Sequence, residues 1–210
     1  MHSISQNKKR GPVIAISGPS GSGKTTYAKM LASDLGLEYY SAGAVFRKLA
    51  EERGLSLVEL NKLAARSREI DFYIDRGVFE RALKGSVVVE GHLVAWITRE
   101  IADIAIYVTA SLDERIRRIA SRESRDFKEV LRETLVREEL QSRRFSEYYG
   151  IDVGNLSIFD LVLDTTSLSI EEAYTIIKSF ACSVLRRKYR WEDCREAYKL
   201  SAWKGEQGKG

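Results

Sequence analysis

The residues with the clearest chemical purpose in this sequence are Lys24 and Thr25, which end a glycine-rich stretch. Two glycines, Gly18 and Gly23, are separated by four residues and followed by lysine and a hydroxyl residue, the spacing of a phosphate-binding loop. In such a loop backbone N–H groups surround phosphate oxygens, the lysine reaches the β- and γ-phosphates, and the hydroxyl ligates Mg²⁺. The sequence therefore predicts a site for a nucleoside triphosphate with Mg²⁺, with Thr25 as the metal ligand. The predicted ATP-binding residues are Gly18, Pro19, Ser20, Gly21, Ser22, Gly23, Lys24, Thr25 and Thr26.

The segments on either side of this loop are those that a phosphate site requires. Residues 13–17 are apolar and β-branched, which predicts a buried parallel strand. Residues 25–35 carry apolar side chains at helical spacing, and Gly36 ends the helix. A glycine-rich turn without a ligand is the alternative, and the complete motif between strand and helix favours the site.

Composition limits the class of protein. The chain has 210 residues, 30% charged and 44% hydrophobic, which suits one α/β domain with a full core. No apolar run approaches the roughly 18 residues of a membrane span. The N-terminal extension, residues 1–12, is polar and has no apolar stretch, so a cytoplasmic protein without a membrane partner is expected. Cys182 and Cys194 match no metal or redox motif, and plain thiols are expected.

Charge is distributed unevenly. The net charge of +4 lies entirely in residues 182–210, whereas residues 1–181 carry equal numbers of basic and acidic side chains. The high pI is therefore no argument that the whole domain binds nucleic acid.

Four further apolar runs, each followed by helical segments, predict the rest of the sheet. Together with residues 13–17 they indicate a three-layer α/β/α fold around a five-stranded parallel sheet. The helices predicted between the second and third strands would form a small lobe above the ligand crevice. These runs are residues 37–40, 86–90, 104–108 and 161–163.

Several polar residues fall at the carboxyl ends of these strands, where ligands bind in parallel sheets. Ser41-Ala42-Gly43 precedes Arg47, which could bind a second phosphate, although an exposed helix arginine is the alternative. Glu90 ends the third strand and could hold a water molecule on Mg²⁺. Asp71 and Asp75 share one face of a helix, and we expect that face to be solvated rather than part of a site.

An arginine-rich stretch follows the fourth predicted strand. Arg115, Arg118 and Arg122 recur at helical spacing and share one face. A salt-bridged pair of surface helices is one interpretation. We favour a lid that neutralises the charge of a transferring phosphoryl group, because that reaction depends on positioning and charge stabilisation.

Over about residues 13–181 the sequence resembles the archaeal cytidylate kinases, which are nucleoside monophosphate kinases. Phosphate loops occur in many proteins, but the run from Tyr149 to Val162 is specific to few families. The resemblance also rests on Ser41-Ala42-Gly43, Phe46-Arg47, Glu69-Ile70-Asp71, Asp75-Arg76, Val89-Glu90-Gly91, Arg115, Arg118-Ile119-Ala120, Arg122-Glu123 and Arg144.

The resemblance implies Mg²⁺-dependent transfer of the γ-phosphoryl group of ATP to CMP or dCMP. It implies an acceptor-binding segment at about residues 41–85 and a lid at about residues 111–148. The family pattern has arginine where this sequence has His92, which would hold an acceptor less well near neutral pH. The implied catalytic residues are Lys24, Arg115, Arg118, Arg122 and Arg144. The implied acceptor-binding residues are Ser41, Gly43, Arg47, Glu90, Gly91 and His92.

The extension at residues 182–210 goes beyond the usual end of the family. It interleaves basic residues with Tyr189, Trp191, Tyr198 and Trp203, a composition that could stack on single-stranded nucleic acid. Docking on its own domain is the interpretation we favour. Besides the (d)CMP kinase, three alternatives stay open: a kinase for AMP or UMP, a P-loop ATPase or switch, and a nucleic-acid-binding protein regulated by its P-loop. We expect a monomer.

Overall fold

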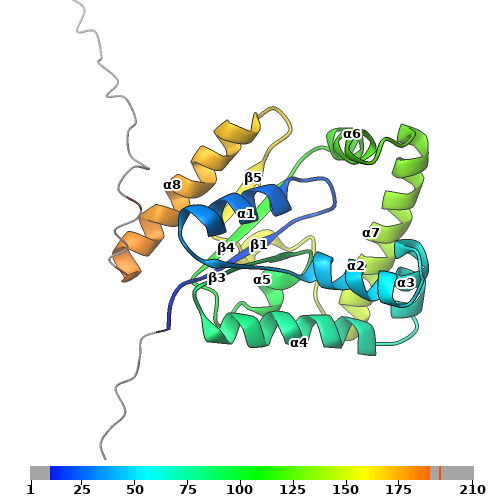
Figure 1. Cartoon of the computed structure of the whole chain (residues 1–210), viewed down its shortest axis with the longest axis horizontal. Helices are drawn as coiled ribbons and strands as arrows, with labels where there is room; N and C mark the ends of the chain where they lie inside the picture. Colours follow the sequence, from blue (N-terminus) through cyan, green and yellow to red (C-terminus); the bar gives the residue numbers. More distant parts are fainter. Residues whose placement is uncertain (1–9, 190–193, 195–210) are drawn as a thin grey trace, which may run out of the picture.

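The computed structural model describes residues 10–189 and Cys194, which form a parallel sheet with helices on both faces (Figure 1). The five strands lie in the order β2-β3-β1-β4-β5, and each neighbouring pair is parallel. The predicted three-layer α/β/α class is therefore confirmed. The strands are β1 Val13–Ser17, β2 Glu38–Ser41, β3 Val87–Gly91, β4 Ile104–Thr109 and β5 Leu161–Asp164.

The central strand β1 places the phosphate loop in the middle of the sheet. It pairs with β3 on one side, Val13 opposite Val87, and with β4 on the other, Ile14 opposite Ile104. Every residue of β1 and β3 is buried, which explains why these strands appear in the sequence as continuous apolar runs. The loop that leaves β1 therefore has strand ends on both sides of it.

Alternate side chains of β1 enter two separate cores. Ile14 and Ile16 pack on the face covered by helices α1, Lys24–Asp34, and α8, Ile170–Tyr189. Val13 and Ala15 pack on the opposite face, which is covered by α4 and α5. The period of two along a strand produces this division. The second pair of helices spans Glu69–Lys84 (α4) and Val94–Ile97 (α5).

The other helices gather beyond the carboxyl ends of the strands (Figure 1). The short helices α2 and α3 pack with the start of α4 around Leu60 and Ile70. Helices α6 and α7 pack on each other around Ile116 and Val130. Two helical groups therefore occupy the segments for which the sequence analysis predicts a lobe and a lid. These elements are α2 Ala42–Glu52, α3 Leu57–Ala64, α6 Leu112–Glu123, α7 Phe127–Tyr149 and the 3₁₀ turn η1 Leu156–Ile158.

The expectation of plain thiols is wrong, because Cys182 and Cys194 form a disulfide. Their Cα atoms lie 5.4 Å apart, and both side chains are buried with the α1–α8 core. The pairing depends on where residue 194 lies in space, which the spacing of two cysteines does not reveal. The rest of the extension after residue 189, with Trp191, Tyr198 and Trp203 and the interpretations placed on them, lies outside the described residues.

Candidate active site

The phosphate loop requires glycine for steric reasons as well as for its turn. Gly18 and Gly21 have φ values of 155° and 78°, in a region that residues other than glycine rarely adopt. A Cβ atom on Gly18 would lie 2.0 Å from the carbonyl oxygen of Val108, and one on Gly21 would lie 2.5 Å from that of Arg115. The loop is therefore packed tightly between β4 and α6, and the first turn of α1 points its N–H groups into the site.

Lys24 is buried at the start of α1, and its ammonium group donates to the carbonyl oxygen of Pro19 at 3.1 Å. Burial lowers the pKa of Lys24 to about 8. The nearby cations of Arg137 and Arg47 lower it further, while the carboxylates of Glu90 and Glu138 oppose the shift. A bound polyphosphate would raise the pKa of Lys24 again, because its negative charge stabilises the ammonium form.

Glu90, at the end of β3, is the centre of a buried network of hydroxyl groups. Its Oε1 accepts hydrogen bonds from Thr25 Oγ1 at 3.3 Å, from Tyr39 at 3.0 Å and from Ser41. Ser41 also caps α2 by accepting from the N–H of Ala44. The network places a carboxylate oxygen beside the hydroxyl of Thr25, and hard oxygen ligands of this kind suit Mg²⁺.

One cavity of about 600 Å³ joins the phosphate loop to both helical groups. At one end it is bounded by α6 and the start of α8, and at the other by α2, α3, α4 and α7. A cavity of this size accommodates a small ligand, and its two ends differ in composition. Predicted residues that line it are Ser20, Gly21, Gly23, Lys24, Thr25, Thr26, Gly43, Arg47, Glu90, Gly91, His92, Arg118, Arg122 and Arg144.

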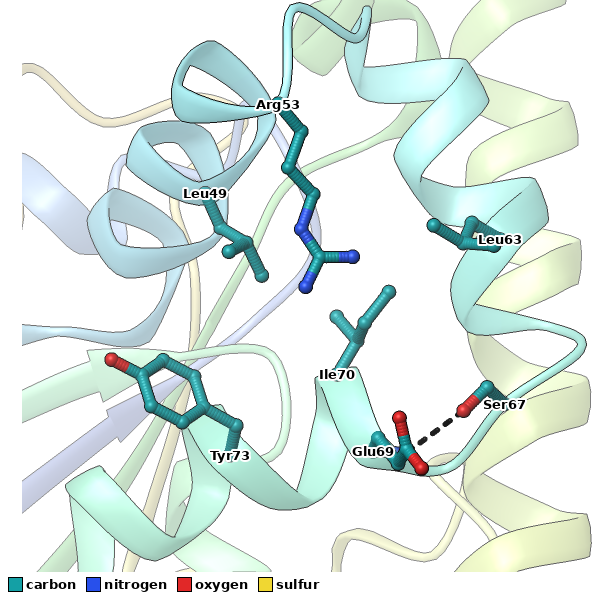
Figure 2. A pocket seen from close by; sticks show the side chains of 7 residues that line it. All are labelled: Leu49, Arg53, Leu63, Ser67, Glu69, Ile70 and Tyr73. Carbon is teal, nitrogen blue, oxygen red and sulfur yellow. Dashed lines mark hydrogen bonds between the residues drawn. The ribbon is translucent and has the colours of Figure 1, made fainter.

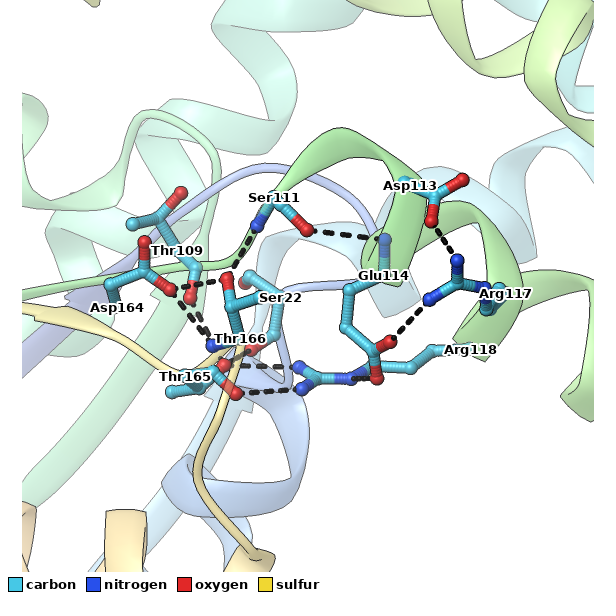
Figure 3. A network of polar contacts seen from close by, with 10 residues as sticks. All are labelled: Ser22, Thr109, Ser111, Asp113, Glu114, Arg117, Arg118, Asp164, Thr165 and Thr166. Carbon is cyan, nitrogen blue, oxygen red and sulfur yellow. Dashed lines mark hydrogen bonds and ion pairs between the residues drawn. The ribbon is translucent and has the colours of Figure 1, made fainter.

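The arginines of α6 are held in different ways. Arg115 is buried and donates to the carbonyl oxygen of Ser20 at 3.0 Å and to Glu138, so it links α6 and α7 to the phosphate loop. Arg118 donates to the hydroxyl and carbonyl oxygens of Thr165 at 3.0 and 2.8 Å (Figure 3). Arg122 is exposed and pairs with Glu123. Arg118 and Arg122 border the cavity, whereas Arg115 supports its edge.

The network around Arg118 also links the strand ends to the loop. The hydroxyl of Thr165, directly after β5, lies 3.0 Å from the carbonyl oxygen of Thr109 and 3.3 Å from that of Ser22, and its one hydrogen can bond to either (Figure 3). Arg118 in turn pairs with Glu114 of its own helix at 2.9 Å. The start of α6, the end of β5 and the phosphate loop are therefore fixed relative to one another.

Helix α7 contributes two residues that the sequence analysis did not assign to the site, Arg137 and Gln141. Arg137, Gln141 and Arg144 lie on one face at helical spacing and line the cavity. Arg137 Nε and Gln141 Oε1 are buried, and neither finds a hydrogen-bond partner among the described residues. Unpaired buried polar atoms at a cavity are typical of a ligand site. In the sequence, the i, i+4, i+7 spacing of these three polar residues could have indicated that they share one helix face.

Asp71 and Asp75 are not on a solvated face, so that expectation is wrong. Asp71 is buried in an ion pair with Arg144, with Nε of the guanidinium 2.8 Å from Oδ2. Asp75 accepts a hydrogen bond from the hydroxyl of Tyr149 at 2.5 Å. Both carboxylates line the cavity. Their partners on α7 lie more than 70 residues away in the sequence, so only the fold brings them together.

His92 lies beside the phosphate loop, with Nε2 3.4 Å from the hydroxyl of Ser20. Burial and the cations of Lys24 and Arg137 hold the pKa of His92 well below its usual value. The ring is therefore neutral at physiological pH, and the position that is arginine in the family pattern adds no positive charge here.

A second, smaller cavity of about 390 Å³ lies between α2, α3 and α4 (Figure 2). It is lined by Leu49, Arg53, Leu63, Ser67, Glu69, Ile70 and Tyr73, none of which borders the larger cavity. It contains no residue of the phosphate loop, and we assign it no part in the reaction.

The strand order and the phosphate loop define a P-loop α/β/α fold, and comparisons of structure agree with this fold. A shikimate kinase from Acinetobacter baumannii superimposes with a TM-score of 0.52 at 16% identity, covering 85% of this chain and 96% of that protein. An uncharacterized protein from Eubacterium ventriosum superimposes with a TM-score of 0.60 at 20% identity, covering 80% and 97%. At such identities the likeness concerns the fold.

Comparisons of sequence are more specific. A model of the cytidylate kinase-like family matches residues 13–167. The chain is 55% identical over 168 residues to a cytidylate kinase of Staphylothermus marinus, covering 80% of this chain and 95% of that protein. It is 53% identical to a cytidylate kinase of Ignicoccus hospitalis, covering 79% and 96%. The chain belongs to the cytidylate kinase-like family.

Proposed function

We propose that this protein transfers the γ-phosphoryl group of ATP to CMP or dCMP. The observation that carries the proposal is one continuous cavity, which joins the phosphate loop to a polar pocket between α3, α4 and α7. A donor and an acceptor can share such a cavity only if their phosphates meet near Lys24. The choice of a cytidine nucleotide as the acceptor rests on the cytidylate kinases of Staphylothermus marinus and Ignicoccus hospitalis, to which the chain is more than 50% identical.

In this proposal the loop and Lys24 hold the β- and γ-phosphates of ATP. Arg118 and Arg122 border the donor end, and Arg47 and Arg137 face the site where the two nucleotides meet. Phosphoryl transfer passes through a transition state with its charge spread over the equatorial oxygens, so fixed cations around it lower the barrier. Segment 41–85 then acts as the acceptor-binding segment and segment 111–148 as the lid.

Mg²⁺ fits the residues that are present. Thr25 would ligate the ion directly, and Glu90 would hold it through a water molecule, because its Oε1 lies 3.3 Å from the hydroxyl of Thr25. When bound, the ion neutralises charge between the β- and γ-phosphates. Tyr39 and Ser41 keep Glu90 oriented by donating to the same oxygen.

The test is whether ATP consumption depends on the acceptor. The purified protein is incubated with ATP and Mg²⁺, with and without CMP, and ADP is measured together with CDP. The proposal predicts that ADP appears with CMP and equals the CDP formed. ADP formed at the same rate without CMP would instead identify an ATPase or a switch.

A further inference from the structure

The end of the cavity away from the phosphate loop is built to present polar groups to a flat ligand. Asp71 and Asp75 of α4 line it together with Arg144 of α7, which pairs directly with Asp71. Apolar side chains form the walls between them and suit the faces of an aromatic base. These apolar residues are Phe46, Leu57, Ile74 and Phe145.

The hydrogen bonds already made by Asp71 and Arg144 decide which atoms are free. Both carboxylate oxygens of Asp71 accept from Arg144, at 2.8 and 3.3 Å. Arg144 Nη1 donates to the backbone oxygen of Asn61 at 3.3 Å and to its side-chain oxygen at 3.1 Å. Arg144 has five N–H bonds, so one N–H of Nη2 is left for a ligand.

Asp75 is different, because only one of its oxygens is used. Oδ2 accepts from Tyr149, and no described residue donates to Oδ1. The side chain lines the cavity, and with no donor among the described residues Oδ1 is available to accept from a ligand there. The end of the cavity therefore offers one free acceptor on Asp75 and one free donor on Arg144.

This pair of groups matches the edge of cytosine better than that of uracil. Cytosine presents a 4-amino donor beside the acceptors N3 and O2, and carboxylates accept from that amino group in nucleic-acid recognition. Uracil presents an oxygen in place of the amino group and an N–H at position 3. A carboxylate facing the uracil oxygen would be repelled, and a donor facing its N–H would be unpaired.

We propose that Asp75 is the residue that selects cytosine, with Oδ1 accepting from the 4-amino group and Arg144 donating to N3 or O2. The inference rests on the proposed function and adds the group that distinguishes the base. The competing explanation is purely structural: Asp75 would only anchor Tyr149, and base preference would not depend on its charge.

Protonation of Asp75 provides a second way to examine the same group. Burial raises the pKa of Asp75 to about 7; the carboxylate of Asp71 adds to the rise, and Tyr149 and Arg144 oppose it. These are the charged and titratable groups that face Asp75, from α4 and from α7. A protonated Asp75 can donate to the uracil oxygen, so discrimination against UMP should weaken below about pH 7.

The experiment measures kcat/KM for CMP and for UMP at pH 8.5, where Asp75 is ionised. Three proteins are compared: the wild type, Asp75→Asn and Glu80→Gln. The asparagine can keep the bond to Tyr149 and turn an N–H toward the base, so it removes the charge without removing the shape. Glu80→Gln is the matched control, because Glu80 lies on the same helix in an exposed pair with Arg76 and does not line the cavity.

We expect the CMP-to-UMP ratio of kcat/KM to fall at least about tenfold in Asp75→Asn and to stay unchanged in Glu80→Gln. In the wild type the same ratio should fall as the pH is lowered from 8.5 to 6, and this dependence should vanish in Asp75→Asn. The ionisation of the nucleotide phosphate is common to both substrates and cancels in the ratio.

A wild-type-like ratio in a folded Asp75→Asn protein that still binds ATP would overturn the assignment of Asp75. If that variant fails to fold, the wild-type profile decides, and a ratio that is constant from pH 6 to 8.5 overturns it. If the proposed function itself is wrong, the result is distinguishable, because the wild type would then phosphorylate neither CMP nor UMP.

Discussion

At the scale of single residues, Lys24 has the most direct link between environment and chemistry. Its ammonium group is buried with cations nearby, so its pKa falls to about 8 in the free protein. A buried ammonium group of this kind favours the binding of an anion, because bound phosphates stabilise its charged form. The charge is present below this pKa and is lost as the pH rises through it.

The affinity for ATP should therefore weaken as the pH rises above about 8. We expect the dissociation constant to rise as the pH passes through about 8, where Lys24 loses its proton, and to keep rising toward pH 9.5, measured by titration with a fluorescent ATP analogue. Lys24→Ala should bind ATP more weakly, lose this pH dependence and lose at least about 100-fold in kcat. Equal pH dependence in the two proteins, or near-normal turnover of Lys24→Ala, would contradict this role.

At the scale of elements, α7 connects the two helical groups around the cavity. Near its start it packs on α6 through Val130, and farther along it Glu138 pairs with Arg115. Farther still, Arg144 reaches Asp71 on α4 and Asn61 on α3. Helix α7 thus both lines the cavity and holds α3 and α4 in place.

Neighbouring arginines on α7 provide a direct comparison of two kinds of ion pair. Arg144→Ala should lower the free energy of unfolding by about 3–5 kcal/mol, because it leaves the carboxylate of Asp71 buried and unpaired. Arg143→Ala should change it by less than about 1 kcal/mol, because the pair with Glu147 is exposed. Urea denaturation measures both. Equal losses would show that the Asp71 pair does not hold α7 to α4.

At the scale of the whole molecule, the disulfide ties Cys194 to α8 on the face of the sheet covered by α1. Neither cysteine lines the cavity, whose last lining residue is Ile170. A chain ending at Arg190 should therefore keep kcat/KM for CMP within about threefold, yet melt at a lower temperature. Closing a loop of this length stabilises a protein by about 3 kcal/mol.

Cys194→Ser in the full chain is the control, and a reducing agent should lower the melting temperature of the wild type to a similar extent. A hundredfold loss of kcat/KM in the truncated but folded protein would place the extension in the active site. An unchanged melting temperature would mean that the disulfide adds nothing to stability.

Much of this fold was predictable, because buried parallel strands appear as uninterrupted apolar runs such as Val87–Gly91 and each strand was located to within about a residue. The phosphate loop was predictable because its chemistry is local. The carboxylates at Asp71 and Asp75 were not, since their partners on α7 lie more than 70 residues away. The expectation of plain thiols at Cys182 and Cys194 was wrong for a related reason, because the spacing of two cysteines does not show whether the fold brings them together.

Phosphoryl transfer from ATP to a cytidine nucleotide can be tested with a panel of acceptors. With ATP and Mg²⁺, kcat/KM is measured for CMP, dCMP, UMP, AMP and GMP by the release of ADP and the appearance of each diphosphate. We expect CMP and dCMP to give the highest values and chelation of Mg²⁺ to abolish transfer. The highest value for AMP, or no phosphorylated product from any acceptor, would contradict it.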